Sequence, residues 1–322
     1  MTILRRIAWR AVYFVLGVTG VATFGGFLSD RGWLFDVMAA FRPVYLAAQA
    51  GAGILLFVRR RWLGAAAALL LIAANAQQVL PLYLSPKQTP VAGSDPSSQR
   101  LRVLQLNSHI RNSEAEKVLA YAKSIDADLF AVEEVSKSVG KYLEQRLSEQ
   151  YPFLFTFLAD TGAGIALFSK YPLLDPQLVY FADPGLPSIV SKIHISGADI
   201  TVVVTHPLSP TTPYGYRLRN RQLRAIAETR KRYSERLIVI GDLNVTSWSS
   251  IFSELTERAG LLDTRRGFGT QPTWPKLNPG PFALAPIDHC LVSPHFRIVS
   301  RRVGPDVGSD HLPIIVDLEL IA

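Results

Sequence analysis

Three long apolar stretches in the first 84 residues constrain this chain more than any other feature of its sequence. They cover residues 7–28, 38–58 and 62–82, and a helix needs roughly 20 apolar residues to cross a bilayer. The first stretch is too long for a secretory signal peptide, and no small-residue cleavage site follows it. The alternative is a helical hairpin buried in a soluble protein, but all three stretches would then have to be covered by protein. We therefore expect residues 1–84 to form a membrane anchor with three transmembrane helices.

The basic residues of this segment predict its orientation. Arginines at positions 5, 6 and 10 lie at the start of the first stretch, and residues 59–61 are three arginines that close the second. Positive charge is retained in the cytoplasm, so both clusters are expected inside. Three spans then place residue 84 and everything after it outside. The sequence thus predicts a multi-pass protein of the cell membrane whose globular domain lies on the extracytoplasmic (periplasmic or extracellular) side.

A change in composition separates the anchor from the rest of the chain. Residues 85–99 read SPKQTPVAGSDPSSQ, which is typical of a linker, and residues 100–322 are the predicted catalytic domain. Residues 1–90 contain nine Lys or Arg and two Asp or Glu, whereas residues 91–322 contain twenty-five and twenty-four. The domain is therefore close to neutral and lacks the charge excess typical of a nucleic-acid-binding face. An arginine-rich helix at 217–232 is interpreted as an outer helix paired with acids, rather than as a contact for lipid or nucleic acid.

Short apolar runs within residues 100–322 read as buried strands, with helical patterns between some of them. Polar side chains cluster at the ends of these runs, as Asn107 does after 101–106 and Asp242 after 237–240. The order of strands and helices predicts two packed sheets with helices outside. Ligand sites in such layered folds commonly lie at strand ends. The candidate site residues are Asn107, Glu134, His206, Asp242, Asn244, Asp288, Asp310 and His311.

The chemistry of these side chains indicates a hard metal ion and a phosphate ester. Carboxylates and amides with few sulfur ligands suit Mg²⁺ or Mn²⁺, and the single cysteine, Cys290, leaves no thiolate cluster for a zinc site. Amides and imidazoles beside such an ion can bind phosphate oxygens and stabilise the charge that develops on them. Metal-assisted hydrolysis of a phosphate ester uses all of these groups together.

Seven segments carry a resemblance to a known family. In chain order they are NSH, ADLFAVEEV, GIALFSKYP, THP, GDLN, IDHCLVS and GSDHLP. In this order and spacing they resemble the endonuclease/exonuclease/phosphatase superfamily over about residues 100–320. The anchor makes the chain similar to bacterial membrane-anchored members. The resemblance implies a deoxyribonuclease-like fold: an α/β four-layer sandwich of two packed mixed sheets with outer helices, preceded here by the three transmembrane helices.

The resemblance also implies a metal site. Glu134 matches the principal metal ligand, Asn107 lies beside it, and Asp310 is assigned to the same site. Asp310 is further expected to orient His311. The family often has Gln-Glu where this chain has Glu133 and Glu134, so Glu133 either points into another layer with no effect or adds charge near the metal.

The catalytic roles follow by position in the same way. Asp242 matches the residue that positions or activates the attacking water, and Asn244 matches its phosphate-binding companion. His206 matches the histidine that stabilises the phosphoryl oxygens or assists the leaving group. His311 matches the imidazole close to the scissile phosphate, and Asp288 matches an acid associated with the site before the last strands.

The predicted function is that of a membrane-anchored, divalent-metal-dependent phosphoesterase. Its substrate would be a phosphodiester or phosphomonoester in a lipid head group or a small molecule. A metal-dependent nuclease is the alternative, and a non-catalytic phosphate-binding scaffold is a second one. The near-neutral domain favours the first, because a nuclease usually needs a cationic track for the nucleic-acid backbone. The expected partners are the phosphate ester and membrane lipids, and no protein partner is inferred.

Overall fold

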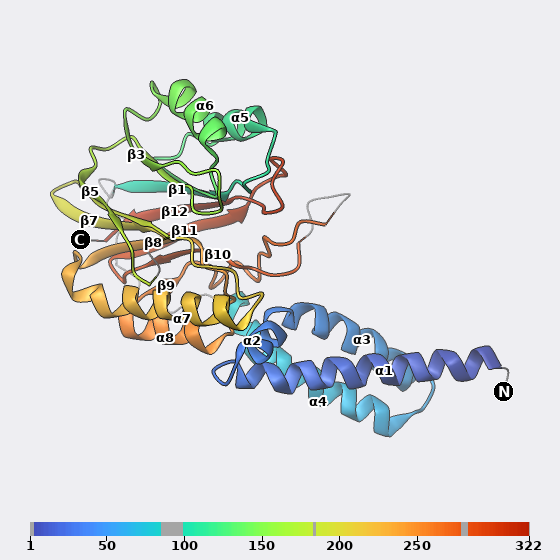
Figure 1. Cartoon of the computed structure of the whole chain (residues 1–322). Helices are drawn as coiled ribbons and strands as arrows, with labels where there is room; N and C mark the ends of the chain where they lie inside the picture. Colours follow the sequence, from blue (N-terminus) through green and yellow to red (C-terminus); the bar gives the residue numbers. More distant parts are fainter. Residues whose placement is uncertain (1–2, 85–98, 183–184, 278–282, 322) are drawn as a thin grey trace.

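The computed structural model describes residues 3–84, 99–182, 185–277 and 283–321. Figure 1 shows a unit of long helices, formed by the N-terminal segment, at one end of an α/β domain. Nearly all of the predicted linker, residues 85–99, lies outside the described residues, so its structure stays a prediction.

Two N-terminal helices are long and apolar enough to cross a membrane, Arg6–Leu28 and Trp62–Tyr83. A third span exists if α2 and α3 count as one, although they are bent by 62°. The predicted span over 38–58 is thus divided near its start, where the sequence has Arg42 and Pro43. Pro43 lies in the first turn of α3, where it cannot donate a backbone hydrogen bond to the preceding turn. The elements of this unit are α1 (Ile3–Gly25), η1 (Gly26–Leu28), α2 (Trp33–Ala40), α3 (Arg42–Val58), α4 (Trp62–Val79) and η2 (Leu80–Tyr83).

The helical unit has apolar side chains outside and a polar cluster inside. Phe14, Leu63 and Leu70 are 71%, 90% and 72% exposed. Between the helices, buried Asn75 donates hydrogen bonds to the Thr23 hydroxyl at 2.8 Å and to Gln49 Oε1 at 3.1 Å. This distribution is the reverse of that in a water-soluble bundle, and it matches helices whose outer surface faces lipid.

The first sheet of the α/β domain has the strand order β11-β12-β1-β2-β4-β3. Strands β1 and β2 are parallel, and every other neighbouring pair is antiparallel, so the sheet is mixed. Its strands are β11 (Phe296–Val303), β12 (Ile314–Leu320), β1 (Arg100–Asn107), β2 (Leu129–Glu133), β4 (Ile165–Ser169) and β3 (Phe153–Phe157).

The second sheet has the order β5-β6-β7-β8-β10-β9 and is also mixed, because β7 and β8 are parallel. Its remaining neighbours are antiparallel. Its strands are β5 (Leu174–Val179), β6 (Ser188–Ile195), β7 (Ala198–Val204), β8 (Arg236–Asp242), β10 (Asp288–Val292) and β9 (Leu262–Asp263).

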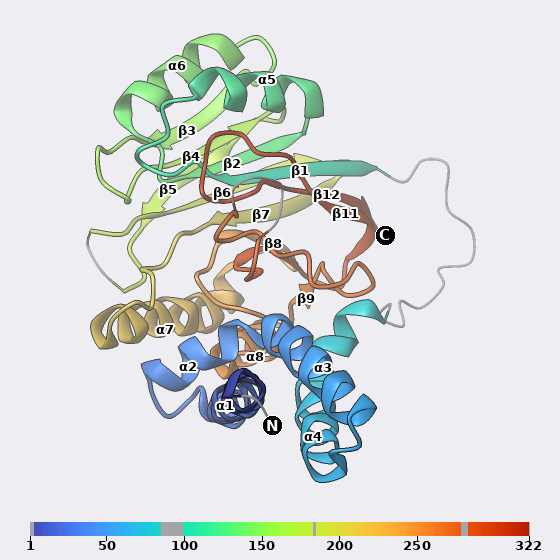
Figure 2. The same ribbon diagram turned by 90° about the vertical axis from the view of Figure 1, so that its right-hand side faces the viewer.

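Alternation along the strands builds four layers. In β1, Leu101 and Val103 pack in the core between the two sheets, whereas Leu104 and Leu106 pack under the helices. The outer helices are α5 (Ala115–Ile125), α6 (Lys137–Leu147), α7 (Pro213–Glu228) and α8 (Ser250–Ala259), and a short η3 (Thr229–Arg232) extends α7. Figure 2 shows α5 and α6 above the first sheet and α7 and α8 below the second, which confirms the predicted four-layer α/β sandwich.

The helical unit contacts the α/β domain on the side of α7 and α8 (Figures 1 and 2). Asp36 of α2 forms an ion pair with Arg219 of α7 at 2.9 Å. The hydroxyls of Ser29 and Ser250 are 2.9 Å apart, and the Gly267 amide donates to the Leu82 carbonyl at 2.9 Å. Residues 29, 36 and 82 thus bind the domain at one end of the helical unit.

Candidate active site

The polar strand ends predicted from the sequence meet at one edge of the sandwich. Asn107 at the end of β1 is in register with Glu133 at the end of β2, and Asp242 of β8 is in register with Asp288 of β10. Asn107 joins the two sheets, because its amide nitrogen lies 3.0 Å from Glu134 Oε1 and 3.0 Å from Asp242 Oδ2. Pairing within each sheet and contact between the sheets therefore bring residues from distant parts of the chain together.

The neighbouring acids Glu133 and Glu134 point in different directions. Glu134 follows the strand with a left-handed backbone (φ 51°), which turns its side chain into the site. Glu133 is fully buried and accepts a hydrogen bond from Gln105 Nε2 at 2.7 Å. Burial raises the pKa of Glu133 well above its usual value, which favours the uncharged carboxyl group. Of the two alternatives for Glu133, the structure supports the one in which it adds no charge to the site.

Asp242 is the centre of the site. Its Oδ2 atom lies 3.5 Å from His206 Nε2 and 3.7 Å from His311 Nε2, while its Oδ1 accepts the Asn244 amide at 2.9 Å. Gly241, the residue before Asp242, lets β8 lie close to Thr205, the residue before His206. A Cβ at position 241 would lie 2.0 Å from the Thr205 carbonyl oxygen. A carboxylate that faces two imidazoles can accept a proton or align a water molecule between them.

His311 is held by Asp288. Its Nδ1 lies 2.9 Å from Asp288 Oδ2, and Asp288 Oδ1 accepts a hydrogen bond from Gln105 at 2.8 Å. Burial disfavours the charged imidazole, but the charges of Asp288 and Asp242 outweigh it and raise the pKa of His311 to about 10. Burial likewise opposes ionisation of Asp288, yet His311 keeps the pKa of Asp288 below its usual value. The two groups therefore form a buried ion pair at neutral pH.

The expected orientation of His311 by Asp310 is wrong. Asp310 Oδ2 instead accepts a hydrogen bond from Trp274 Nε1 at 3.2 Å, and its Oδ1 is buried without a hydrogen-bond partner. The reason is that consecutive side chains here diverge, and the Ser309 hydroxyl fixes the His311 amide at 3.0 Å while Asp288 takes the ring.

His206 lies on the other side of Asp242. Its Nδ1 is 3.2 Å from the Gly162 carbonyl, and its Nε2 is 3.7 Å from Glu134 Oε1. Burial lowers its basicity, but Asp242 and Glu134 prevail and raise the pKa of His206 to about 9. In turn His206 and Asn107 outweigh burial and hold the pKa of Glu134 below its usual value. His206 is thus a cation at neutral pH, suited to phosphate oxygens.

These groups surround a pocket of about 520 Å³. Asn107 and Asp288 lie behind it, 1% and 0% exposed, so the structure brings all eight predicted side chains into one cluster but lets only some reach a ligand. The predicted residues that line the pocket are Glu134, His206, Asp242, Asn244, Asp310 and His311.

Residues outside the predicted set lie in or beside the site. His109, which is not among the eight predicted residues, also lines the pocket. His289 is fully buried, with Nε2 2.7 Å from the Val245 carbonyl, and burial with the charge of Arg265 holds its pKa well below the usual value. Gln105 was missed, yet a polar residue at a core-facing position of the run LRVLQL was a usable signal. Arg219 belongs to the helix that the sequence predicted to pair with acids, but its partner, Asp36 of the N-terminal helical unit, was not predicted.

The donor set fits a hard divalent cation. Asp242, Asp288 and His311 each have a potential ligand atom, and these atoms lie within 4.8 Å of one another. His311 is charged and paired with Asp288, so the Asp242 carboxylate is the member of this group that is suited to a cation. The buried, unpartnered Oδ1 of Asp310 and the ionised Glu134 add two more carboxylates at the pocket. Oxygen ligands of this kind are those that Mg²⁺ and Mn²⁺ prefer, and a cation there would offset the clustered negative charge.

Fold and site together define the class: a four-layer α/β sandwich with carboxylates and imidazoles at one edge of its sheets. The sequence profile of the Endonuclease/Exonuclease/phosphatase family matches residues 93–311, and the chain belongs to this family. No curated protein matches the chain.

Solved structures share the fold at low sequence identity. TDP2 from D. rerio, complexed with a single-strand DNA product, has a TM-score of 0.58 at 16% identity and covers 68% of this chain and 99% of its own. Sphingomyelinase C from Streptomyces griseocarneus has a TM-score of 0.54 at 17% identity, covering 68% and 99%. A mannosyl-6-phosphatase from Bacteroides thetaiotaomicron has a TM-score of 0.56 at 19% identity, with the same coverage. The relatives thus include hydrolases with different phosphate-ester substrates.

Proposed function

We propose that this protein is a membrane-anchored, divalent-metal-dependent phosphoesterase that hydrolyses a phosphate ester of a lipid head group or a small molecule. The observation that carries the proposal is the position of Asp242, which contacts Asn107 and faces His206 and His311 at an open pocket. A scaffold that only bound phosphate would not need an acidic residue between two imidazoles, because a carboxylate repels phosphate.

Each side chain of the site has a separate role in the proposed reaction. Asp242 aligns a water molecule and accepts its proton as the water oxygen bonds to phosphorus and the ester P–O bond breaks. His206 and Asn244 bind the phosphoryl oxygens, and His311, held by Asp288, donates a proton to the leaving oxygen. Glu134 and Asp310 would hold Mg²⁺ or Mn²⁺, with Asn107 orienting Glu134 from behind the pocket, and the bound ion would supply Lewis-acid stabilisation of phosphoryl charge.

The anchor and its orientation belong to the same proposal. The exposed apolar faces of α1 and α4 support insertion in a bilayer. The domain is bound at Ser29 and Leu82, whereas Arg59, Arg60 and Arg61 follow α3 at the other end of the helical hairpin. Because arginine-rich ends stay in the cytoplasm, we place the catalytic domain on the extracytoplasmic side.

The arginines of α7 favour this function over that of a nuclease. Arg219 is buried in its pair with Asp36, Arg224 pairs with Glu254 at 3.0 Å, and Arg221 donates to the Ala182 carbonyl. These contacts support the predicted outer helix paired with acids. They leave little of α7 to bind a nucleic-acid backbone.

The test is a substrate panel for the purified full chain in detergent with Mg²⁺ or Mn²⁺. Plasmid DNA, a generic phosphodiester and phospholipids are offered in parallel to the wild type and the His311→Asn variant. His194→Asn is the matched control, because His194 is exposed and pairs only with Asp199 in the part of the chain described. We expect ester or lipid cleavage that His311→Asn abolishes and His194→Asn keeps. DNA nicking with the esters intact would instead make the protein an anchored nuclease.

A further inference from the structure

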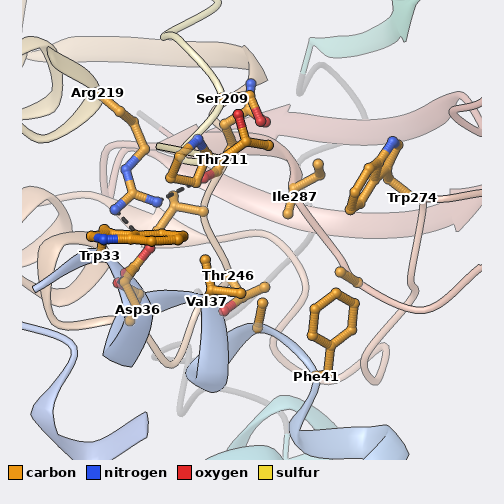
Figure 3. A pocket seen from close by; sticks show the side chains of 16 residues that line it. Trp33, Asp36, Val37, Phe41, Ser209, Thr211, Arg219, Thr246, Trp274 and Ile287 are labelled. Atoms are coloured by element: carbon orange, nitrogen blue, oxygen red, sulfur yellow. Dashed lines mark hydrogen bonds and ion pairs between the residues drawn. The ribbon is translucent and has the colours of Figure 1, made fainter. Parts of the chain in front are cut away.

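A second cavity lies where the anchor meets the catalytic domain. It has a volume of about 290 Å³ and lies between α2 and the loops that follow β7 and β8. Figure 3 shows Trp33, Val37 and Phe41 from the anchor on the same cavity as Trp274 and Ile287 from the domain. Most of its wall is apolar, and we call it the junction pocket.

The junction pocket adjoins the active site. Ser209, Asn244 and Trp274 line both cavities. The Trp274 ring centroid is 6.3 Å from that of His311, and its indole nitrogen donates to Asp310. The two cavities thus share part of their walls, and a molecule that occupied both would lie against these three residues.

The charges in the wall of the junction pocket are already neutralised. Asp36 accepts hydrogen bonds from Arg219 at 2.9 Å and from Ser249 at 2.5 Å. Arg219 also donates to the Asn244 carbonyl at 2.8 Å and to Asn220. No charged group of the lining that the structure describes is left to attract an ionic ligand, so the chemistry of the pocket selects an apolar occupant.

The position of the pocket indicates where this occupant comes from. The wall formed by Trp33 and Val37 belongs to α2, which follows the candidate span Arg6–Leu28 after a short loop. The junction pocket thus lies near the end of this candidate span, where the helical unit contacts the domain. A bilayer crossed by these helices would bring its amphiphiles close to this junction.

We propose that the junction pocket binds the hydrocarbon chain of an amphiphilic phosphate ester drawn from the membrane, while its phosphate occupies the site around Asp242. This inference rests on the proposed function and narrows its substrate class to lipid-like esters. A water molecule takes roughly 30 Å³, and a methylene group is of similar size. A cavity of about 290 Å³ therefore has space for a chain of about ten carbon atoms.

The test compares alkyl p-nitrophenyl phosphate diesters that differ only in chain length, ethyl against hexyl, on the full chain in one detergent. Burying one methylene changes an equilibrium constant about fourfold, so four methylenes give a ratio of kcat/KM of up to about 200. Val37→Trp fills the pocket and should reduce this ratio at least tenfold. Leu34→Trp is the matched control, because Leu34 is on the same helix, is 53% exposed and does not line the pocket.

A ratio near one in the wild type, or an unchanged ratio in Val37→Trp with the protein folded, would overturn the inference. Hydrolysis of both esters would in that case still support the phosphoesterase. If neither ester is hydrolysed with metal present, the proposed function and the inference both fail. Ala40→Leu, a smaller change on the same wall, provides the measurement if Val37→Trp does not fold.

Discussion

Replacing Asp36 by leucine should destabilise the catalytic domain, although Asp36 lies in the anchor. Its carboxylate is bound by Arg219 and by the Ser249 hydroxyl, and the two charged side chains are 4% and 1% exposed. Leucine is larger than aspartate, and Asp36 lines the junction pocket, which has space for the extra atoms. The change therefore removes the charge without opening a cavity. Arg219 would then remain as a buried cation without a carboxylate.

The structure sets the size of this effect. Removing one partner of a buried ion pair costs about 3–5 kcal/mol. Arg219 keeps its hydrogen bonds to Asn220 and to the Asn244 carbonyl, which places the loss near the lower end, about 3 kcal/mol. At about 2–4 °C per kcal/mol for a domain of this size, the Tm should fall by about 6–12 °C. Replacing both partners, Asp36→Leu with Arg219→Met, should cost less than the sum of the single changes because no unpaired charge remains.

The assay is thermal unfolding of the full chain in detergent, followed by fluorescence at one heating rate, for the wild type, both single variants and the double variant. Asp30→Leu is the control, because Asp30 pairs only with Arg31 at 3.3 Å, with both side chains more than half exposed, and such pairs contribute little. The reasoning is refuted if Asp36→Leu melts within 2 °C of the wild type, or if the two single effects simply add.

Three further predictions concern the metal, the pH dependence and the orientation. Glu134→Gln should weaken Mg²⁺ or Mn²⁺ binding at least tenfold in calorimetry, because it removes an ionised oxygen ligand, and equal affinity would exclude Glu134 as a ligand. The raised pKa of His311, about 10 against an unfolded value near 6.5, gives stability that is complete below pH 6.5 and lost as pH rises through 10. The metal-free protein should therefore lose up to about 1.4 kcal/mol per pH unit in that window, and His311→Asn should flatten the curve. Cys290 is buried and should not react with an impermeant maleimide. Lys231→Cys should therefore be labelled on intact cells, and Arg60→Cys only after permeabilisation. The reverse pattern would show that the topology is the opposite of the one proposed.

The strand ends were predictable from the sequence because buried strands are short apolar runs and the polar residues after them stand out. Asn107, Asp242 and Asp288 lie at the predicted edge for this reason. The sequence also distinguished the near-neutral domain from the basic anchor. Periodicity and composition are local properties, and they determined the layers and the position of the site within them.

Contacts between distant segments could not be read in this way. The partner of His311 is Asp288, which lies on β10 of the second sheet, rather than the adjacent Asp310. The pairing of Asp36 with Arg219 depends on how the anchor packs on α7, which no local pattern encodes. The break between α2 and α3 was signalled by Pro43, but the 62° bend and the pocket beside it depend on that packing.

Metal-dependent hydrolysis of a phosphodiester by the full chain tests the central claim most directly. The purified protein is stripped with EDTA and assayed before and after Mg²⁺ or Mn²⁺ is returned, alongside Asp242→Asn, which preserves the shape of the residue facing His206 and His311. The account predicts no hydrolysis without metal, recovery on its return, and a loss of at least a hundredfold in Asp242→Asn. Full activity in EDTA, or an unimpaired Asp242→Asn variant, would contradict it.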